Sequence, residues 1–271
     1  MRIVRFTDSL GEIHHGVDQN DGSALRIQGD IFANYTVTHQ KIAIKKLLAP
    51  LAPVTILCIG LNYRKHAEET GAKIPEYPIL FVKSPASVQN PHDPIEIPQH
   101  LQSTKVDWEC ELAIVIGQRG KNIPKARAFE HILGYTCAND VSARDWQKEF
   151  GGSQWCRGKT FDTFCPLGPA IVTRDEIPNP NALGISTLVN GQILQDSSTA
   201  DMIFDVPTLI EFLSGSCTLL PGMVILTGTP SGVGMGMKPP QFLHPADTVT
   251  VRIEKIGDLT NPVIAEPIST P

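Results

Sequence analysis

The chain has 271 residues, of which 22 are glycine, 22 are proline and 41% are hydrophobic. Because a proline inside a helix costs about 3 kcal/mol, this composition argues against a helical bundle or a coiled coil. The net charge of −5 and the scattered basic residues exclude a typical nucleic-acid-binding surface. Prolines interrupt the longest apolar stretch before it reaches the roughly 20 residues that span a bilayer. We therefore expect neither a nucleic-acid nor a membrane partner.

Residues 1–52 predict a small N-terminal α/β domain. Charged and apolar residues alternate over 2–6, which is typical of a strand and not of a signal peptide. After a turn, residues 13–17 predict a second strand, and residues 42–48 predict one short helix. Pro50 and Pro53 then mark the boundary with a second domain, residues 53–271.

The second domain predicts many strands and few, short helices. A helix over 63–70 begins at the N-cap candidate Asn62 and ends at Gly71. Six prolines between 75 and 98 forbid a long helix there. This pattern predicts a mostly antiparallel sandwich or roll. The other predicted helices are 125–131 and 206–213, and the predicted strands are 54–60, 79–82, 106–116, 132–140, 170–173, 186–189, 223–227 and 248–253.

The six cysteines favour buried, reduced thiols. No two of them form a Cys-x-x-Cys pair, so a zinc site is disfavoured. Free thiols inside apolar segments are typical of intracellular proteins, and we predict a cytoplasmic location. The residues are Cys58, Cys110, Cys137, Cys156, Cys165 and Cys217.

Two carboxylates lie on one face of the strand predicted at 106–116. Alternate residues of a strand share a face, so Glu109 and Glu111 lie together and the opposite face is apolar. Two like charges repel each other unless a cation lies between them, and oxygen-only ligands suit Mg²⁺, Mn²⁺ or Ca²⁺. The alternative is a strand end that faces solvent.

Asp140 ends the apolar strand predicted at 132–140 and could complete a three-carboxylate site. Its alternative role is the N-cap of a helix over 142–149. Arg144 and Gln147 follow at i+4 and i+7 and so lie on its side of such a helix, or else form ordinary polar surface.

The helix over 63–70 places His66 and Glu69 on one face. A carboxylate fixes the tautomer of a neighbouring imidazole and raises its basicity, which suits a general base, although a surface ion pair gives the same spacing. Lys159, between glycine and aromatic residues, could bind a carboxylate or an oxyanion. The glycine-rich turn 227–234 lacks the ending of a P-loop, but its amides could hold a small anion.

Together these segments resemble the fumarylacetoacetate hydrolase family. The matching motifs keep their order and spacing from about residue 54 to the end, and residues 1–52 resemble weakly the smaller N-terminal domain of some members. The motifs are Ile59-Gly60-Leu61-Asn62-Tyr63 with His66, Asp107-Trp108-Glu109-Cys110-Glu111-Leu112-Ala113, 139–147, Gly158-Lys159-Thr160-Phe161-Asp162 and Thr227-Gly228-Thr229-Pro230-Ser231-Gly232.

The resemblance implies an α+β, mostly β fold, a mixed β-sandwich roll, and commonly a homodimer. It implies that Glu109, Glu111 and Asp140 bind a divalent metal, usually Mg²⁺ or Mn²⁺. It further implies that His66 and Glu69 activate water on a segment that closes as a lid. The remaining implied roles are a position behind the metal for Lys159 and Thr163, and substrate contacts for Arg144, Gln147 and Thr229.

The implied substrate is a small 2-oxo or 2,4-dioxo acid. The first expected reaction is hydrolysis of a C–C bond in an acylpyruvate-type substrate by the water that His66 and Glu69 activate. The alternatives are oxaloacetate keto–enol tautomerisation or decarboxylation at the same site, and a non-catalytic metal-binding module. Leu61 stands where acylpyruvate-cleaving members often have arginine, and the later motifs look like the branch whose members are linked to oxaloacetate tautomerisation.

Overall fold

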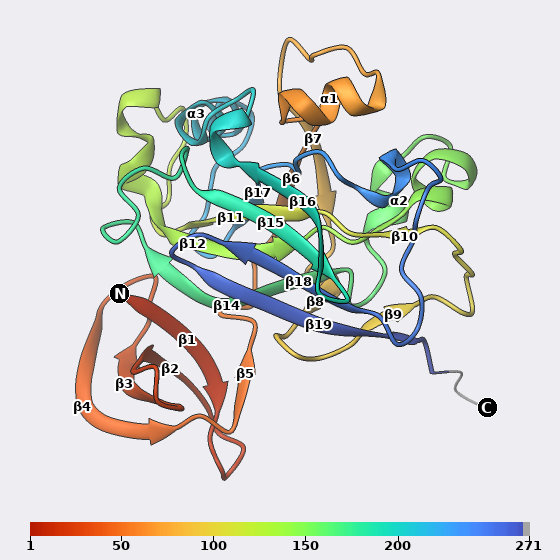
Figure 1. The fold of residues 1–271 in the computed structure, drawn as a ribbon. Helices are drawn as coiled ribbons and strands as arrows, with labels where there is room; N and C mark the ends of the chain where they lie inside the picture. Colours follow the sequence, from red (N-terminus) through yellow and green to blue (C-terminus); the bar gives the residue numbers. More distant parts are fainter. Residues whose placement is uncertain (268–271) are drawn as a thin grey trace.

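Strands dominate the structure, as the proline and glycine content predicts. The computed structural model describes residues 1–267 and contains one large mixed sheet, a five-stranded sheet against it, and a short two-stranded pair (Figure 1). The mostly β, mixed sandwich roll is therefore confirmed. In the described part of the chain, no helix has the length and apolar character needed to cross a membrane.

The large sheet has the order β4-β3-β2-β1-β14-β12-β11-β17-β6-β7, and β5 and β8 pair beside it with β1 and β14. Its antiparallel centre, β12-β11-β17, continues into the parallel pair β17-β6. The bounds are β1 Arg2–Thr7, β2 Ile13–Asp18, β3 Ser23–Gly29, β4 Tyr35–Ala43, β5 Lys46–Leu48, β6 Ile56–Gly60, β7 Ile79–Lys83, β8 Val88–Gln89, β11 Cys110–Ile116, β12 Ile132–Asn139, β14 Cys165–Thr173 and β17 Val224–Leu226.

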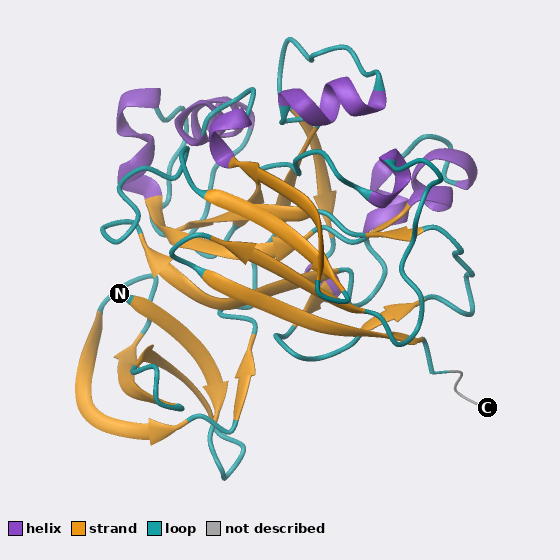
Figure 2. Cartoon of the chain, viewed as in Figure 1, coloured by secondary structure: helices purple, strands orange, loops and turns teal. Residues whose placement is uncertain are grey.

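The second sheet has the order β16-β15-β18-β19-β9, and the separate pair is β10-β13. Figure 2 shows most of the helices along the upper side of the sheets: Arg64–Thr70 and Trp155–Lys159 lie on the side of the predicted site, whereas Lys125–His131 leads into the start of β12, at the other end of that strand. The bounds are β9 Ile95–Ile97, β10 Val106–Asp107, β13 Ser142–Ala143, β15 Gly184–Val189, β16 Gln192–Ser198, β18 Thr248–Ile253 and β19 Gly257–Ala265. The helices are α1 Arg64–Thr70, α2 Trp155–Lys159, α3 Val206–Ser216, a π-helix over Trp146–Phe150, and 3-10 helices over Pro85–Ser87, Lys125–His131, Thr199–Asp201 and Gly234–Gly236.

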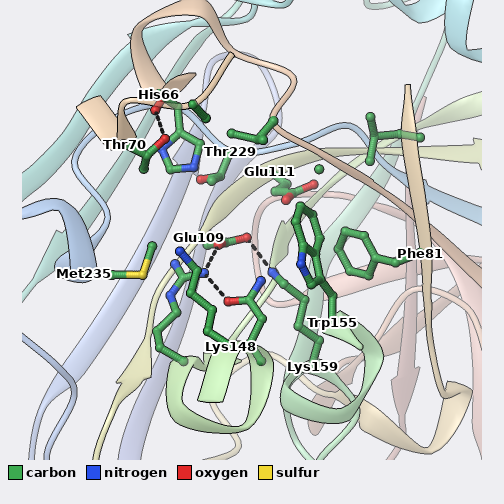
Figure 3. A pocket seen from close by; sticks show the side chains of 16 residues that line it. His66, Thr70, Phe81, Glu109, Glu111, Lys148, Trp155, Lys159, Thr229 and Met235 are labelled. Atoms are coloured by element: carbon green, nitrogen blue, oxygen red, sulfur yellow. Dashed lines mark hydrogen bonds and ion pairs between the residues drawn. The ribbon is translucent and has the colours of Figure 1, made fainter. Parts of the chain in front are cut away.

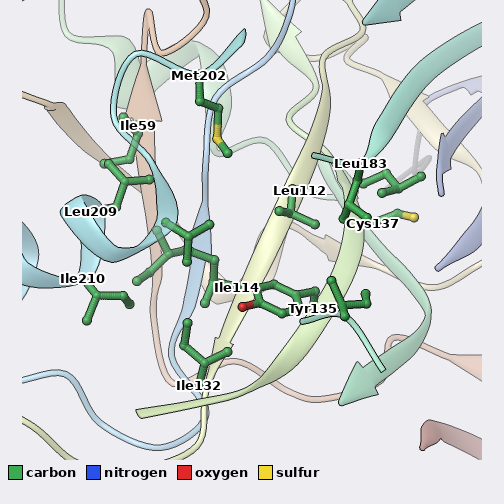
Figure 4. Packing of buried hydrophobic residues seen from close by; sticks show 14 of the residues in the cluster. Ile59, Leu112, Ile114, Ile132, Tyr135, Cys137, Leu183, Met202, Leu209 and Ile210 are labelled. Atoms are coloured by element: carbon green, nitrogen blue, oxygen red, sulfur yellow. The ribbon is translucent and has the colours of Figure 1, made fainter. Parts of the chain in front are cut away.

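The main core lies between the two sheets and under α3. Leu112 and Ile114 of β11 and Tyr135 of β12 face this core and pack towards Leu209 of α3 (Figure 4). Ala113, the β11 residue between the first two, lies instead in a second cluster on the opposite face of the sheet. Both faces of β11 are therefore buried, which holds the strand rigidly and fixes the carboxylates at its start.

The N-terminal segment differs from its prediction. The helix expected over 42–48 is wrong, because this stretch is the end of β4 and the strand β5. Residues 1–52 contain strands and turns, without a helix, and β1 pairs with β14, so this part extends the large sheet. Ile42 and Leu47 pack against a small core under β1, and a strand pair buries such isolated apolar residues as well as a helix face does.

Three local predictions near the site also change. Asn62 does not cap α1, because its side chain bonds to backbone groups of Phe204 and Thr227; Gly71 ends the helix in the left-handed conformation, as predicted. The strand expected over 106–116 is interrupted at residues 108 and 109. The helix expected over 142–149 is a two-residue strand followed by the π-helix, and Asp145 rather than Asp140 caps it.

Candidate active site

Three predicted carboxylates meet where β11 begins and β12 ends. Cys110 pairs with Asn139 across the two strands, which places Glu109, Glu111 and Asp140 side by side. Ligand oxygens of the three groups lie within 4.8 Å of one another, and the residues are 5%, 1% and 0% exposed. The solvent-facing alternative for the glutamates is therefore wrong.

The interruption before β11 explains how Glu109 reaches the other two acids. Asp107 Oδ1 accepts a hydrogen bond from the Trp108 amide at 2.8 Å, and Asn139 Oδ1 accepts one from the Glu109 amide at 3.0 Å. Side chains thus replace the strand partners of these two amides, which keeps the backbone satisfied while the chain leaves the sheet.

Lysine and arginine side chains surround two of the three acids. Lys159 of α2 places Nζ 2.8 Å from both Glu109 Oε2 and Asp140 Oδ2, and Arg144 Nη1 lies 2.6 Å from Glu109 Oε1 (Figure 3). Lys83 of β7 binds the other oxygen of Asp140 at 2.6 Å and is 2% exposed. Burial opposes the ionisation of Glu109, but Lys159 and Arg144 outweigh it and lower its pKa to about 2.

Glu111 has a different environment. Its recorded polar partner is the amide of Gly228, which donates to Oε2 at 2.6 Å; within residues 1–267 no cationic side chain pairs with it. Burial and the neighbouring charges of Asp140 and Glu109 raise the pKa of Glu111 well above its usual range. Glu111 is therefore the acid of the cluster whose charged form burial and its two acidic neighbours disfavour.

This donor set fits a hard divalent cation. It consists only of carboxylate oxygens, which suit Mg²⁺, Mn²⁺ or Ca²⁺. A cation between Glu109, Glu111 and Asp140 would also remove the like-charge repulsion at Glu111. The alternative N-cap role of Asp140 is wrong, because both of its carboxylate oxygens bind lysines.

The predicted dyad is present at the rim of the same cavity. His66 Nδ1 lies 3.2 Å from Glu69 Oε2, and His66 is 7% exposed, so the pair is not an ordinary surface ion pair. Glu69 Oε1 also accepts from the Gly232 amide at 2.9 Å, which ties α1 to the glycine-rich turn.

The glycine-rich turn binds carboxylates of the protein itself. Besides the Gly228 and Gly232 contacts, the Gly234 and Met235 amides donate to Asp107 at 2.8 and 3.0 Å. These four amides already bind carboxylates of the protein and so are not available to a free small anion. The turn instead holds one carboxylate each from β10, β11 and α1 in place.

A cavity of about 140 Å³ joins these parts (Figure 3). Most of the predicted residues line it. Glu69 and Asp140 do not, but they contact His66 and Lys159, which do. Thr163 does not line the cavity: its hydroxyl accepts from the Glu96 amide at 2.9 Å. The predicted residues along the cavity are His66, Glu109, Glu111, Arg144, Gln147, Lys159 and Thr229.

One wall of the cavity is apolar. Phe81 and Trp155 meet edge to face with ring centroids 5.7 Å apart, and the Lys159 ammonium lies 5.1 Å from the Phe81 centroid. Trp155 can lie there only because position 60 is glycine: a Cβ on Gly60 would come within 2.2 Å of the indole. The motif glycine therefore shapes this wall.

Four residues with roles in the site were missed by the sequence analysis. Lys83 binds Asp140, and Asp107 binds Arg144. Lys148 lines the cavity. Gln195, fully buried on β16, donates to Thr229 Oγ1 at 2.8 Å, which leaves the Thr229 proton free for the cavity. The available signal for Lys83 was its position at the end of an apolar strand. Gln195 gave no signal, because it lies on a strand that was not predicted.

The comparisons with known proteins identify the family of the chain. Residues 55–264 match the fumarylacetoacetate (FAA) hydrolase C-terminal family, and residues 1–58 match the Rv2993c-like N-terminal family. The chain is 50% identical over 231 residues to the mitochondrial oxaloacetate tautomerase fahd2 of Xenopus laevis, covering 84% of this chain and 72% of that protein.

Two solved structures extend the likeness over nearly the whole chain. The 2-hydroxyhepta-2,4-diene-1,7-dioate isomerase of Mycobacterium marinum has a TM-score of 0.84 at 38% identity and covers 99% of this chain and 100% of its own. The fumarylacetoacetate hydrolase of Exiguobacterium antarcticum has a TM-score of 0.84 at 38% identity, covering 98% and 100%. The chain therefore belongs to the fumarylacetoacetate hydrolase family and is an enzyme.

Proposed function

We propose that the protein is a divalent-metal-dependent oxaloacetate keto–enol tautomerase. The observation that carries the proposal is the buried Glu109–Glu111–Asp140 cluster, open to a small cavity that also contains His66 and Arg144. The tautomerase name of the Xenopus relative, at 50% identity, favours this alternative over C–C hydrolysis. The cluster, His66 and Lys159 together also disfavour the non-catalytic alternative, because a structural metal needs the acids alone.

Glu109, Glu111 and Asp140 would hold the cation, with Mg²⁺ or Mn²⁺ as the proposed ions. When bound, it supplies Lewis-acid polarisation of the substrate's carbonyl oxygen. Arg144, Gln147 and Thr229 bind and orient the substrate. Thr229 can donate its hydroxyl proton, since Gln195 already occupies its oxygen as an acceptor.

His66 is the proposed base. Because Nδ1 faces Glu69 at 3.2 Å, the Nδ1–H tautomer leaves the lone pair of Nε2 available. His66 then takes a proton from carbon 3 of the keto acid, and the imidazolium so formed gives this proton to the enolate oxygen; the reverse steps restore the ketone and the neutral imidazole. Glu69 stabilises the imidazolium and, through Gly232, holds α1 over the cavity.

Hydrolysis stays a second candidate because the same dyad could activate water, and because the E. antarcticum structure at 38% identity is named a hydrolase. We also propose a homodimer, which light scattering of the purified protein would test. The compartment stays a prediction: this chain is predicted to be cytoplasmic, whereas the Xenopus relative is named mitochondrial.

The test follows the enol absorbance of oxaloacetate and of acylpyruvates with Mg²⁺ or Mn²⁺. Faster equilibration of the oxaloacetate enol, without pyruvate or CO₂, supports the tautomerase. Release of pyruvate from an acylpyruvate would select the hydrolase, and release of CO₂ from oxaloacetate would select the decarboxylase. An unchanged absorbance with every substrate would contradict the proposed chemistry.

His66→Ala is expected to lower kcat for oxaloacetate by about 10²- to 10⁴-fold, the usual contribution of a general base. The side chain is not a member of the acidic cluster, so the Mn²⁺ dissociation constant should change less than about twofold, on the order of 0.4 kcal/mol. Steady-state kinetics and Mn²⁺ titration measure the two effects. His244→Ala, an exposed histidine outside the cavity, is the control. Full activity of the His66 variant would remove the base assignment.

A further inference from the structure

The cavity has two chemically different walls. Phe81 and Trp155 form the apolar wall, and the opposite side carries Lys148, which extends towards Glu109 beside Met235 (Figure 3). Arg144 and Gln147 line the cavity as well. Lys148 directly follows Gln147 in the π-helix Trp146–Phe150, so the same short helix carries both side chains to the cavity.

Arg144 is bound on two of its three nitrogens. Nε lies 2.8 Å from Asp107 Oδ2, and Nη1 contacts both Glu109 and Gln147. Nη2 is buried and has no hydrogen-bond partner among the described residues. Arg144 as a whole is 4% exposed. Arg144 lines the cavity, so this unpaired guanidinium nitrogen lacks a hydrogen bond that an anionic ligand could supply.

Lys148 is the second open donor. Among residues 1–267 no hydrogen bond or ion pair to its ammonium is recorded, whereas the nearby Lys105 pairs with Glu149. Lys148 is an exposed residue; partial burial of its ammonium and the positive charge of Arg144 lower its pKa, and the negative charge of Glu109 opposes this shift. Two neighbouring cations with free donors repel each other, and an anion between them would remove that repulsion.

We propose that Arg144 Nη2 and Lys148 Nζ form a subsite for the second carboxylate of a dicarboxylic 2-oxo acid. The inference rests on the proposed function and deepens it: one end of oxaloacetate lies at the Glu109–Glu111–Asp140 cluster, and its distal carboxylate lies between the two cations. Both groups line one cavity of about 140 Å³, so a single small molecule can reach both.

The subsite explains how one enzyme of this family selects among 2-oxo acids. An acylpyruvate with an apolar distal group offers Lys148 no charged partner, whereas oxaloacetate does. Leu61 also lines the cavity, but its side chain carries no charge. Lys148, which lines the same cavity, supplies the positive charge instead.

Binding of two unreactive acids tests the subsite. Malate and lactate share a 2-hydroxy carboxylate end, and malate adds a distal carboxylate, so the ratio of their dissociation constants reports on the distal contact. Calorimetry on the Mg²⁺-loaded protein is expected to show tighter binding of malate. In Lys148→Met malate should bind about five- to tenfold more weakly, as for a partly exposed charge-assisted hydrogen bond. Lactate should change less than about twofold.

Three further variants complete the design. Lys148→Arg should restore the malate preference, and Lys148→Gln repeats the charge loss with a polar side chain. Lys105→Met removes a nearby lysine that does not line the cavity and should change neither ligand. Equal loss of malate and lactate in Lys148→Met, or no preference for malate in the parent protein, would overturn the subsite.

Failure of the proposed function gives a different result. If the parent protein does not tautomerise oxaloacetate but Lys148→Met selectively weakens malate, the subsite stands and the reaction is wrong. If the parent is a tautomerase and Lys148→Met keeps both the malate affinity and the KM for oxaloacetate, the subsite is wrong and the reaction stands.

Discussion

Glu111→Gln is expected to weaken divalent-metal binding strongly while leaving the metal-free protein at least as stable as the parent. Glu111 is the one acid of the cluster whose partner is an amide, Gly228, rather than a cation. Glutamine has nearly the same shape and its Oε1 can still accept from that amide. Burial and the charges of Asp140 and Glu109 already disfavour the charged form of Glu111, and glutamine cannot take a charged form, so the free energy of unfolding should not fall.

The affinity for the metal, unlike the stability, should fall. Loss of one of three charged ligands should weaken Mn²⁺ binding by at least about 100-fold, beyond the 10–100-fold typical of groups that only support a ligand. Manganese titration by electron paramagnetic resonance measures affinity, and thermal unfolding without metal measures stability. Glu68→Gln, an exposed glutamate on α1, is the matched control for both. A variant that keeps its Mn²⁺ affinity would remove Glu111 from the ligand set.

The glycine-rich turn, with the next residue Met235, holds three carboxylates of the site, of which Glu111 belongs to the acidic cluster. Four of its amides hold the carboxylates of Asp107, Glu111 and Glu69, and each carboxylate comes from a different element. Backbone amides are rigid donors and cost no side-chain entropy, so they orient the acids in advance. The same turn thus contacts three parts of the site: Glu111 of the acidic cluster, Asp107, which binds Arg144, and Glu69, which binds His66.

The sequence predicts those parts of the site that local spacing determines. Strand alternation separates Glu111 from Leu112, and helix spacing pairs His66 with Glu69, because both depend on residues a few positions apart. Acids stand before the apolar run of β11 and after the apolar run of β12, which is why Glu109 and Asp140 were found. The family motifs then supplied Lys159, Arg144, Gln147 and Thr229.

Other features depend on contacts that no local pattern records. The helix predicted over 42–48 is strand because β4 and β5 find partners in β3 and β1. Lys83 meets Asp140 only because β7 lies at the sheet edge beside the cluster, 57 residues away in sequence. Thr163 follows the Lys159 motif closely, yet its positive φ of 66° and its bond to Glu96 direct its hydroxyl elsewhere.

Lys159→Met is expected to lower both stability and activity, and to make stability depend strongly on metal. The ammonium is 2% exposed and lies 2.8 Å from Glu109 Oε2 and from Asp140 Oδ2. Removing one partner of a buried ion pair costs about 3–5 kcal/mol, because the remaining charge stays buried. Arg144 and Lys83 still pair with the two acids, so we expect the lower end, about 3 kcal/mol.

In a chain of this length a loss of about 3 kcal/mol lowers the melting temperature by roughly 6–12 °C. Mg²⁺ should restore more of that loss in the variant than it adds to the parent, because a cation bound by Glu109 and Asp140 replaces the missing positive charge and stabilises only the folded state. Thermal unfolding with and without Mg²⁺ measures both effects. Lys41→Met breaks the exposed pair with Asp21 and should cost no more than about 1 kcal/mol, with no metal dependence. Equal metal-induced shifts in Lys159→Met and the parent would show that the lysine and the cation do not act on the same carboxylates.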